Sequence, residues 1–66
     1  MLLVMAQNAT QGQIDAVITA VRERGYTPRP IPGGERISIG ILNNEGPVDG
    51  SFFLGMPGVK EAIPVT

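Results

Sequence analysis

The 66-residue sequence predicts an α+β fold, a four-stranded antiparallel sheet with two helices on one of its faces. Three observations lead to this prediction. Apolar residues recur at helical spacing in one segment, isoleucines alternate with other residues in another, and the prolines near the predicted strands fall in only two of them. The resulting order is strand, helix, strand, strand, helix, strand.

The first strand and the first helix lie at the start of the chain. Residues 2–6 (LLVMA) are apolar at consecutive positions, which is typical of a central strand covered on both faces. Thr10 and Gln13 have the spacing of a capping box, so a helix is expected over residues 11–24, ended by Gly25. Its apolar stripe, at i, i+3, i+4 and i+7, consists of Ile14, Val17, Ile18 and Val21.

Prolines occupy every second position of the segment YTPRPIP, at residues 28, 30 and 32. Alternate N–H groups of a strand point to the same side, so the three missing donors fall on one edge. A strand at the edge of a sheet tolerates this loss, and the prolines also oppose edge-to-edge association. The competing interpretation is a polyproline II segment that pairs with no other strand.

The segment RISIGIL predicts the next strand, with Ile37, Ile39 and Ile41 on the face that meets the helices. The glycine pair before it predicts a turn. A hairpin turn is favoured over a phosphate-binding loop because the Gly-x-Gly-x-x-Gly spacing is missing and a strand, not a helix, follows.

The positions of the prolines favour a four-residue hairpin loop over residues 32–35. Such a loop keeps the prolines out of the hydrogen-bonded pairs between the two strands. It is expected to place Ile31 opposite Arg36 and Arg29 opposite Ser38.

A second helix and a fourth strand complete the fold. Pro47 suits the first turn of a short helix that carries Val48 and the apolar run FFL at residues 52–54. Residues 59–65 predict the last strand, in which Pro64 marks a second edge. The residues of this strand available for packing are Ala62, Ile63 and Val65.

Right-handed crossovers connect these elements into a ferredoxin-like βαββαβ arrangement with strand order 4-1-3-2. The prolines then lie in both edge strands and in neither central strand. The whole chain, residues 1–66, is expected to be one such domain.

The composition excludes several classes of function. The sequence has no cysteine and no histidine, so thiolate and imidazole chemistry and the commonest metal ligands are absent. Five basic and six acidic residues give a net charge of −1, which does not favour nucleic-acid binding. No carboxylate pair or activated nucleophile suggests catalysis, and no signal peptide or membrane span is expected. We therefore expect a cytoplasmic binding or association domain with no catalytic residues, metal or cofactor of its own.

The sheet face that the helices leave uncovered is the candidate binding surface. Two arginines, a serine hydroxyl and a bare glycine backbone beside apolar residues could receive a small carboxylate ligand. The alternative is that the arginines are solvated or pair with Glu35 and Glu45. The candidate effector-binding residues are Arg29, Ile31, Arg36, Ser38 and Gly40.

Three segments of the chain resemble the N-terminal ferredoxin-like domain of DAHP synthase (3-deoxy-7-phosphoheptulonate synthase). They are LLVMAQNATQGQIDAVITAVRERGY, the GGER turn followed by ISIGI, and MPGVKEAIPV, in the same order as in that family. The resemblance covers essentially the whole sequence. It implies a regulatory domain related to ACT modules, which precedes a catalytic barrel that these residues do not include.

The resemblance also implies partners. The barrel condenses phosphoenolpyruvate with erythrose 4-phosphate and holds a divalent metal, as the first step toward aromatic amino acids. In feedback-inhibited members the domain helps to bind an aromatic amino acid between neighbouring subunits, so a homo-oligomer through the open sheet face is expected. At the effector-contacting positions of the second strand this sequence has Arg29 and Ile31, a departure from the family's polar residues. The alternatives are a purely structural dimerisation domain and a free-standing small-molecule sensor.

Overall fold

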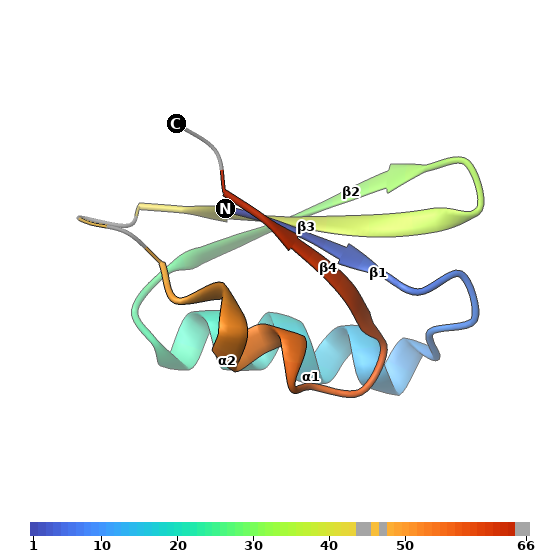
Figure 1. The fold of residues 1–66 in the computed structure, drawn as a ribbon, viewed down its shortest axis with the longest axis horizontal. Coiled ribbons are helices and arrows are strands. Elements are labelled where there is room, and N and C mark those ends of the chain that lie inside the picture. Colours follow the sequence, from blue (N-terminus) through green and yellow to red (C-terminus); the bar gives the residue numbers. More distant parts are fainter. Residues whose placement is uncertain (44–45, 47, 65–66) are drawn as a thin grey trace.

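The computed structural model describes residues 1–43, 46 and 48–64. Two helices lie against one face of a four-stranded antiparallel sheet, and no helix or strand among these residues covers the other face (Figure 1). The strand order is β2-β3-β1-β4, which confirms the predicted ferredoxin-like topology. The elements are β1 (Leu2–Met5), α1 (Gln11–Glu23), β2 (Thr27–Gly33), β3 (Arg36–Leu42), α2 (Gly50–Leu54) and β4 (Val59–Ile63).

The hydrophobic core lies between the helices and the inner face of the sheet. Alternate residues of β1 point inward, and Leu3 and Met5 are fully buried while Leu2 and Val4 on the other face are half-buried. The isoleucine alternation in β3 is confirmed in the same way, since Ile39 is fully buried. The complete core consists of Leu3, Met5, Ile14, Val17, Val21, Ile39, Ile41 and Phe53.

The predicted capping box of α1 is present. The Thr10 hydroxyl accepts the Gln13 backbone N–H at 3.1 Å, and the Gln13 side chain accepts the Thr10 N–H at 3.0 Å. These bonds satisfy donors that the first helical turn leaves unpaired. At the other end Arg24 is the C-cap, and Gly25 takes the left-handed conformation with φ of 86°.

The loop between β2 and β3 is shorter than the sequence predicted. The four-residue loop over residues 32–35 is wrong, because Gly33 pairs with Arg36 and only Gly34 and Glu35 remain in the turn. Gly34 has φ of 63°. A two-residue type II′ turn requires glycine at this first central position. The centre of the turn therefore lies one residue later in the chain than the sequence predicted.

The changed loop shifts the pairing of β2 along β3 by two residues. Ile31 lies opposite Ser38 instead of Arg36, and Arg29 lies opposite Gly40 instead of Ser38. Because a two-residue shift preserves the alternation of faces, every side chain stays on the face that the sequence predicted.

Hydrogen bonds of β3 explain why β2 tolerates its prolines. The Ile41 N–H donates to the Met1 carbonyl at 2.9 Å, so the N–H groups of alternate residues 39 and 41 face β1. Those of Ser38 and Gly40 then face β2, and their partners in β2 are not prolines. The proline nitrogens point away from the sheet, as expected for an edge strand. Pro28, Pro30 and Pro32 lie opposite Ile41, Ile39 and Ile37.

The second helix starts later than predicted. Its N-cap is Asp49, whose side chain accepts the Ser51 N–H at 3.1 Å, so Val48 precedes the helix instead of lying within it. The Asp49 side chain supplies an acceptor for the first helical turn, which is why the helix begins there. The predicted role of Pro47 lies outside the described residues.

The last strand ends at Ile63, so Pro64 follows the strand instead of lying within it, and the predicted role of Val65 lies outside the described residues. Ala62 packs against the core, whereas Ile63 is 41% exposed. Ile63 points away from the core, because consecutive residues of a strand point to opposite faces. The predicted position of this strand at an edge is confirmed.

We expect Val17→Asp or Ile39→Asp to unfold the isolated domain. Both side chains are fully buried in the core. An unpaired buried charge costs several kcal/mol, and a domain of this size is stabilised by only about 3–5 kcal/mol. Thermal unfolding followed by circular dichroism is the measurement, with Thr19→Asp on the exposed side of α1 as the control. A cooperative transition with an unchanged midpoint in either core variant would contradict the core assignment.

Candidate functional site

The face opposite the helices, here called the open face, is formed by alternate residues of all four strands. Two rows cross the sheet at its centre, since Leu2 and Val4 of β1 pair with residues on both sides. One row is Arg29, Gly40, Leu2 and Ile63, and the next is Ile31, Ser38, Val4 and Glu61. Leu42 and Arg36 extend the face along β3.

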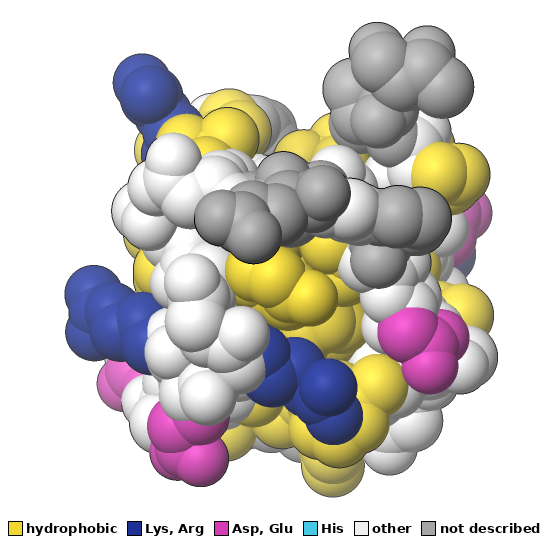
Figure 2. Space-filling model, turned by 90° about the vertical axis from the view of Figure 1, so that its left-hand side faces the viewer, with side chains coloured by type: hydrophobic (Ala, Val, Ile, Leu, Met, Phe, Trp, Pro, Cys, Tyr) yellow, Lys and Arg dark blue, Asp and Glu magenta, His cyan; other side chains and the backbone are white. Residues whose placement is uncertain are grey.

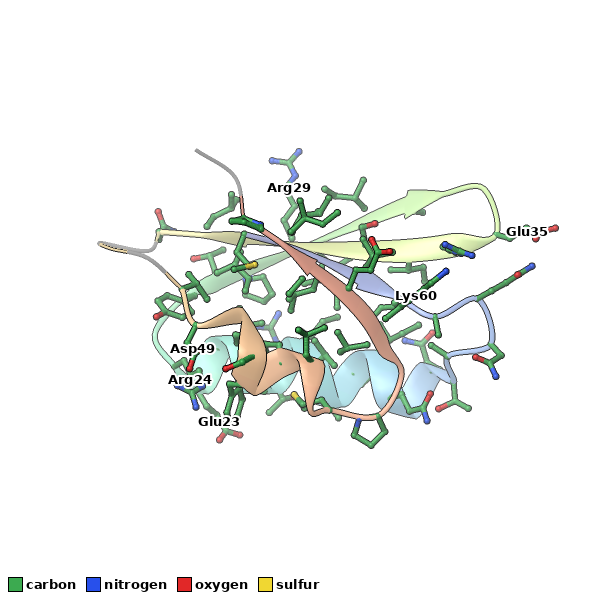
Figure 3. All side chains as sticks on the ribbon, in the orientation of Figure 1. Glu23, Arg24, Arg29, Glu35, Asp49 and Lys60 are labelled. Atoms are coloured by element: carbon green, nitrogen blue, oxygen red, sulfur yellow. The ribbon has the colours of Figure 1, made fainter. Side chains whose placement is uncertain are left out.

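The side chains of Arg29 and Ile31 lie next to Gly40. A Cβ added at Gly40 would lie 3.8 Å from the Arg29 Cβ and 3.8 Å from the Ile31 Cδ1. The Arg29 side chain rises from the sheet on the side away from the helices (Figure 3). The expectation of a bare glycine backbone is wrong, because Gly40 is buried with these two side chains close by. The Arg29 guanidinium lies beside the apolar Ile31.

Ser38 and Arg36 complete the predicted set of residues, but they do not converge with Arg29 on one point. Arg36 is four residues along β3 from the glycine that pairs with Arg29. At about 3.4 Å per residue, the two arginine Cα atoms are about 14 Å apart. Ser38 lies between them, is half-buried, and its hydroxyl makes no hydrogen bond to another described residue. The centre of the candidate site is thus Arg29, Ile31, Ser38 and Gly40, with Arg36 at its margin.

The sequence left open that Glu35 and Glu45 pair with the arginines. The structure does not support such a pair for Glu35. Its carboxylate accepts a hydrogen bond from the Gln7 side chain, which links the β2–β3 turn to the β1–α1 loop. Glu45 lies outside the described residues. Within the part of the chain that the structure describes, Arg29 and Arg36 form no ion pair.

Two residues of the open face were not among those predicted from the sequence. Glu61 and Ile63 lie beside Val4 and Leu2, in line with the rows that contain Ser38 and Arg29. The alternation of β4 could have indicated that these two share a face. Which face this is depends on the register with β1, which the sequence alone does not give.

A model of the family described as the DAHP synthase ferredoxin-like domain matches residues 1–66, the entire sequence. The chain belongs to this family. No curated protein gives a significant match. The resemblance seen in the three segments of the sequence is therefore confirmed for the domain as a whole.

A second surface of this DAHP synthase ferredoxin-like domain lies where α1 ends and α2 begins. The Arg24 guanidinium lies 3.6 Å from the centre of the Phe52 ring, a cation–π contact, and Phe52 meets Phe53 edge to face with ring centres 5.1 Å apart. Figure 2 shows hydrophobic side chains in the middle of this end of the molecule, with a basic side chain lying across them and other charged side chains at the margins. Arg24 is thus engaged with the second helix, whereas Arg29 has no such contact.

The described residues of the domain include no group of three or more acidic side chains placed to hold a metal ion. None of its helices in the described part of the chain has the length and hydrophobicity needed to cross a bilayer. The open face remains the surface with both a charged donor and apolar contacts.

We expect the stability of the domain to fall in acid partly through Asp49. Hydrogen bonds from the Ser51 hydroxyl, at 2.6 Å, and from its backbone N–H lower the pKa of Asp49 below the ordinary 3.8, and Arg24 lowers it further. A depressed pKa in the folded state stabilises the fold above pH 3.8, and this contribution is lost as the pH falls through the folded-state pKa.

The Asp49→Asn variant retains a cap oxygen but does not titrate, so its melting temperature should fall less steeply than that of the wild type below about pH 4. Thermal melts between about pH 2 and 6 make the comparison. Identical slopes for the two proteins would show that Asp49 has the same pKa folded and unfolded.

Proposed function

We propose that this domain regulates a DAHP synthase catalytic barrel by binding an aromatic amino acid on its open face. The observation that carries the proposal is the Arg29 guanidinium, free of any ion pair with a described residue, on a face with exposed apolar side chains. Family membership supports the link to DAHP synthase.

The open face offers groups for the carboxylate and for the ring of an aromatic amino acid. A guanidinium binds a carboxylate through two parallel hydrogen bonds, a geometry that a lysine does not provide. The Ser38 hydroxyl is half-buried and available for a further hydrogen bond. An aromatic ring would lie on Leu2 together with either Ile31 or Leu42, which are 44% and 43% exposed.

A ligand lying on a flat sheet is covered on one side only. Small-molecule sites usually bury 70–90% of the ligand surface, roughly, so a second surface is needed. A second copy of the domain, related by a two-fold axis and facing the first, would supply it. Apolar residues Leu42 and Ile31 would lie in the contact, with Arg36 at the rim.

The two other interpretations differ from this proposal in the role of Arg29 or in the presence of a catalytic barrel. A purely structural association domain would use the same apolar face without a ligand, so Arg29 would have no specific role. A free-standing sensor would bind the ligand but have no barrel downstream in the parent gene. The family match favours association with a barrel over the free-standing sensor.

We expect an aromatic ligand to raise the melting temperature of the domain. Phenylalanine, tyrosine, tryptophan, chorismate and prephenate are the compounds to test by thermal shift. A ligand at 100 times its Kd stabilises a protein by about 2.7 kcal/mol, which corresponds to about 10 °C or more for a domain this small. Arg29→Gln should abolish the shift, whereas Arg36→Gln should leave most of it. If none of the five compounds shifts the wild type, the effector proposal is wrong and the structural interpretation stands.

We expect Leu42→Glu to weaken face-to-face association at least tenfold, which is about 1.4 kcal/mol. The side chain is 43% exposed in the isolated domain and would become buried against the second copy, where an unpaired carboxylate is unfavourable. Arg36→Ala at the rim should have a much smaller effect. Sedimentation equilibrium up to millimolar concentration measures both. A wild type that stays monomeric throughout would leave the barrel as the partner of this face.

A further inference from the structure

Two charged side chains of the open face have no partner, and they lie on opposite edge strands. Arg29 belongs to β2 and Glu61 to β4, and both side chains are exposed. Neither side chain forms an ion pair or a hydrogen bond with another residue that the structure describes. Both charges are therefore available to groups from outside the domain.

The two charges are too far apart to bind one amino acid within a single copy. Three strand spacings of about 4.8 Å separate β2 from β4, and the two residues lie in adjacent rows. With about 3.4 Å per residue along a strand, the Cα atoms of Arg29 and Glu61 are about 16 Å apart. The carboxylate and ammonium groups of an amino acid are attached to one carbon atom, so a ligand held by Arg29 does not reach Glu61 of the same copy.

The facing copy that the proposed function requires brings the two charges together for one choice of the two-fold axis. An axis parallel to the strands, between β3 and β1, places β2 of each copy over β4 of the other. Packed sheets lie about 10 Å apart, a gap that side chains from both faces fill. Arg29 of one copy and Glu61 of the facing copy then lie one row apart, and the symmetry repeats this pair.

Charge selects this axis over an axis perpendicular to the strands. A perpendicular axis in the plane of contact would place β2 over β2 and β4 over β4. In the two rows at the centre of the open face, β2 contributes one charge, Arg29, and β4 contributes one charge, Glu61. Two guanidinium groups would then gather at one side and two carboxylates at the other, and like charges at a contact oppose association.

We propose that the amino-acid ligand binds between facing copies, with its carboxylate on Arg29 of one copy and its ammonium group on Glu61 of the other. This inference rests on the proposed function and adds the second charged residue of the site. Both contacts are charge-assisted hydrogen bonds. The ligand class is then an aromatic α-amino acid. Chorismate and prephenate have carboxylates but no ammonium group, and they would bring a further negative charge to Glu61.

Ligands with and without the ammonium group test the role of Glu61. Isothermal titration calorimetry on the 66-residue domain at millimolar concentration measures the binding of phenylalanine, tyrosine and tryptophan, and of the three analogues in which hydrogen replaces the ammonium group. Glu61→Gln should weaken binding of the amino acids about tenfold or more and leave binding of the analogues unchanged. Arg29→Gln should weaken the binding of both classes. Glu23→Gln, at the end of α1, is the control and should change neither.

A mixture of the two variants shows whether the charges come from different copies. In a dimer of one Arg29→Gln chain and one Glu61→Gln chain, one site has both wild-type residues and the other site has neither. About half of the dimers in an equal mixture are of this kind, so about a quarter of all sites should bind as in the wild type. A site built within one copy would gain nothing from mixing.

The possible outcomes separate this inference from the proposed function. If no amino acid binds the wild type, the proposed function fails and the inference fails with it. If an amino acid binds the wild type and Glu61→Gln equally well, only the assignment of Glu61 is wrong. Equal weakening of amino acids and analogues by Glu61→Gln also overturns the assignment, because Glu61 then pairs with Arg29 and not with the ligand. A mixture that recovers no binding overturns the arrangement across two copies.

Discussion

The hydrogen bonding of β1 to a strand on each side is the constraint on which the rest of the domain depends. Its odd-numbered residues bond to β3 and its even-numbered residues to β4, as the Met1–Ile41 and Ala6–Gly58 bonds show. This alternation directs Leu3 and Met5 into the core. Through β3 it also sends the proline nitrogens of β2 outward at one edge.

The size of the domain explains why it presents so much apolar surface. Two helices, one of them only five residues long, cover a single face of the sheet. A short chain buries only about 60% of the surface of its unfolded state. Three of the exposed large apolar side chains, Ile31, Leu42 and Ile63, lie on the open face. Contiguous apolar surface of this kind generally marks a site of binding or association.

The arginines of the domain have different environments, and this separates structural from functional surfaces. Arg24 stacks on Phe52, contributes to the electrostatic environment of Asp49 and so connects the end of α1 to the start of α2. Arg29 lies on the open face with no partner among the described residues. A charged group that contributes nothing visible to the fold, on a face with exposed apolar side chains, is the feature that favours ligand binding there.

The sequence by itself determined the elements and their faces. The Thr10–Gln13 box and the stripe containing Val17 encode α1 locally, and alternation at Ile39 encodes the inner face of β3, because both depend only on neighbours along the chain. The prolines identified β2 as an edge strand because the absence of their N–H groups is likewise a local property of the sequence. Only the tertiary structure decided the register: Gly34 starts the turn, so Arg29 meets Gly40 and not Ser38. It also decided that Glu61 and Ile63 join the open face. Pairing across strands is a contact between distant residues, and several registers satisfy the same alternation.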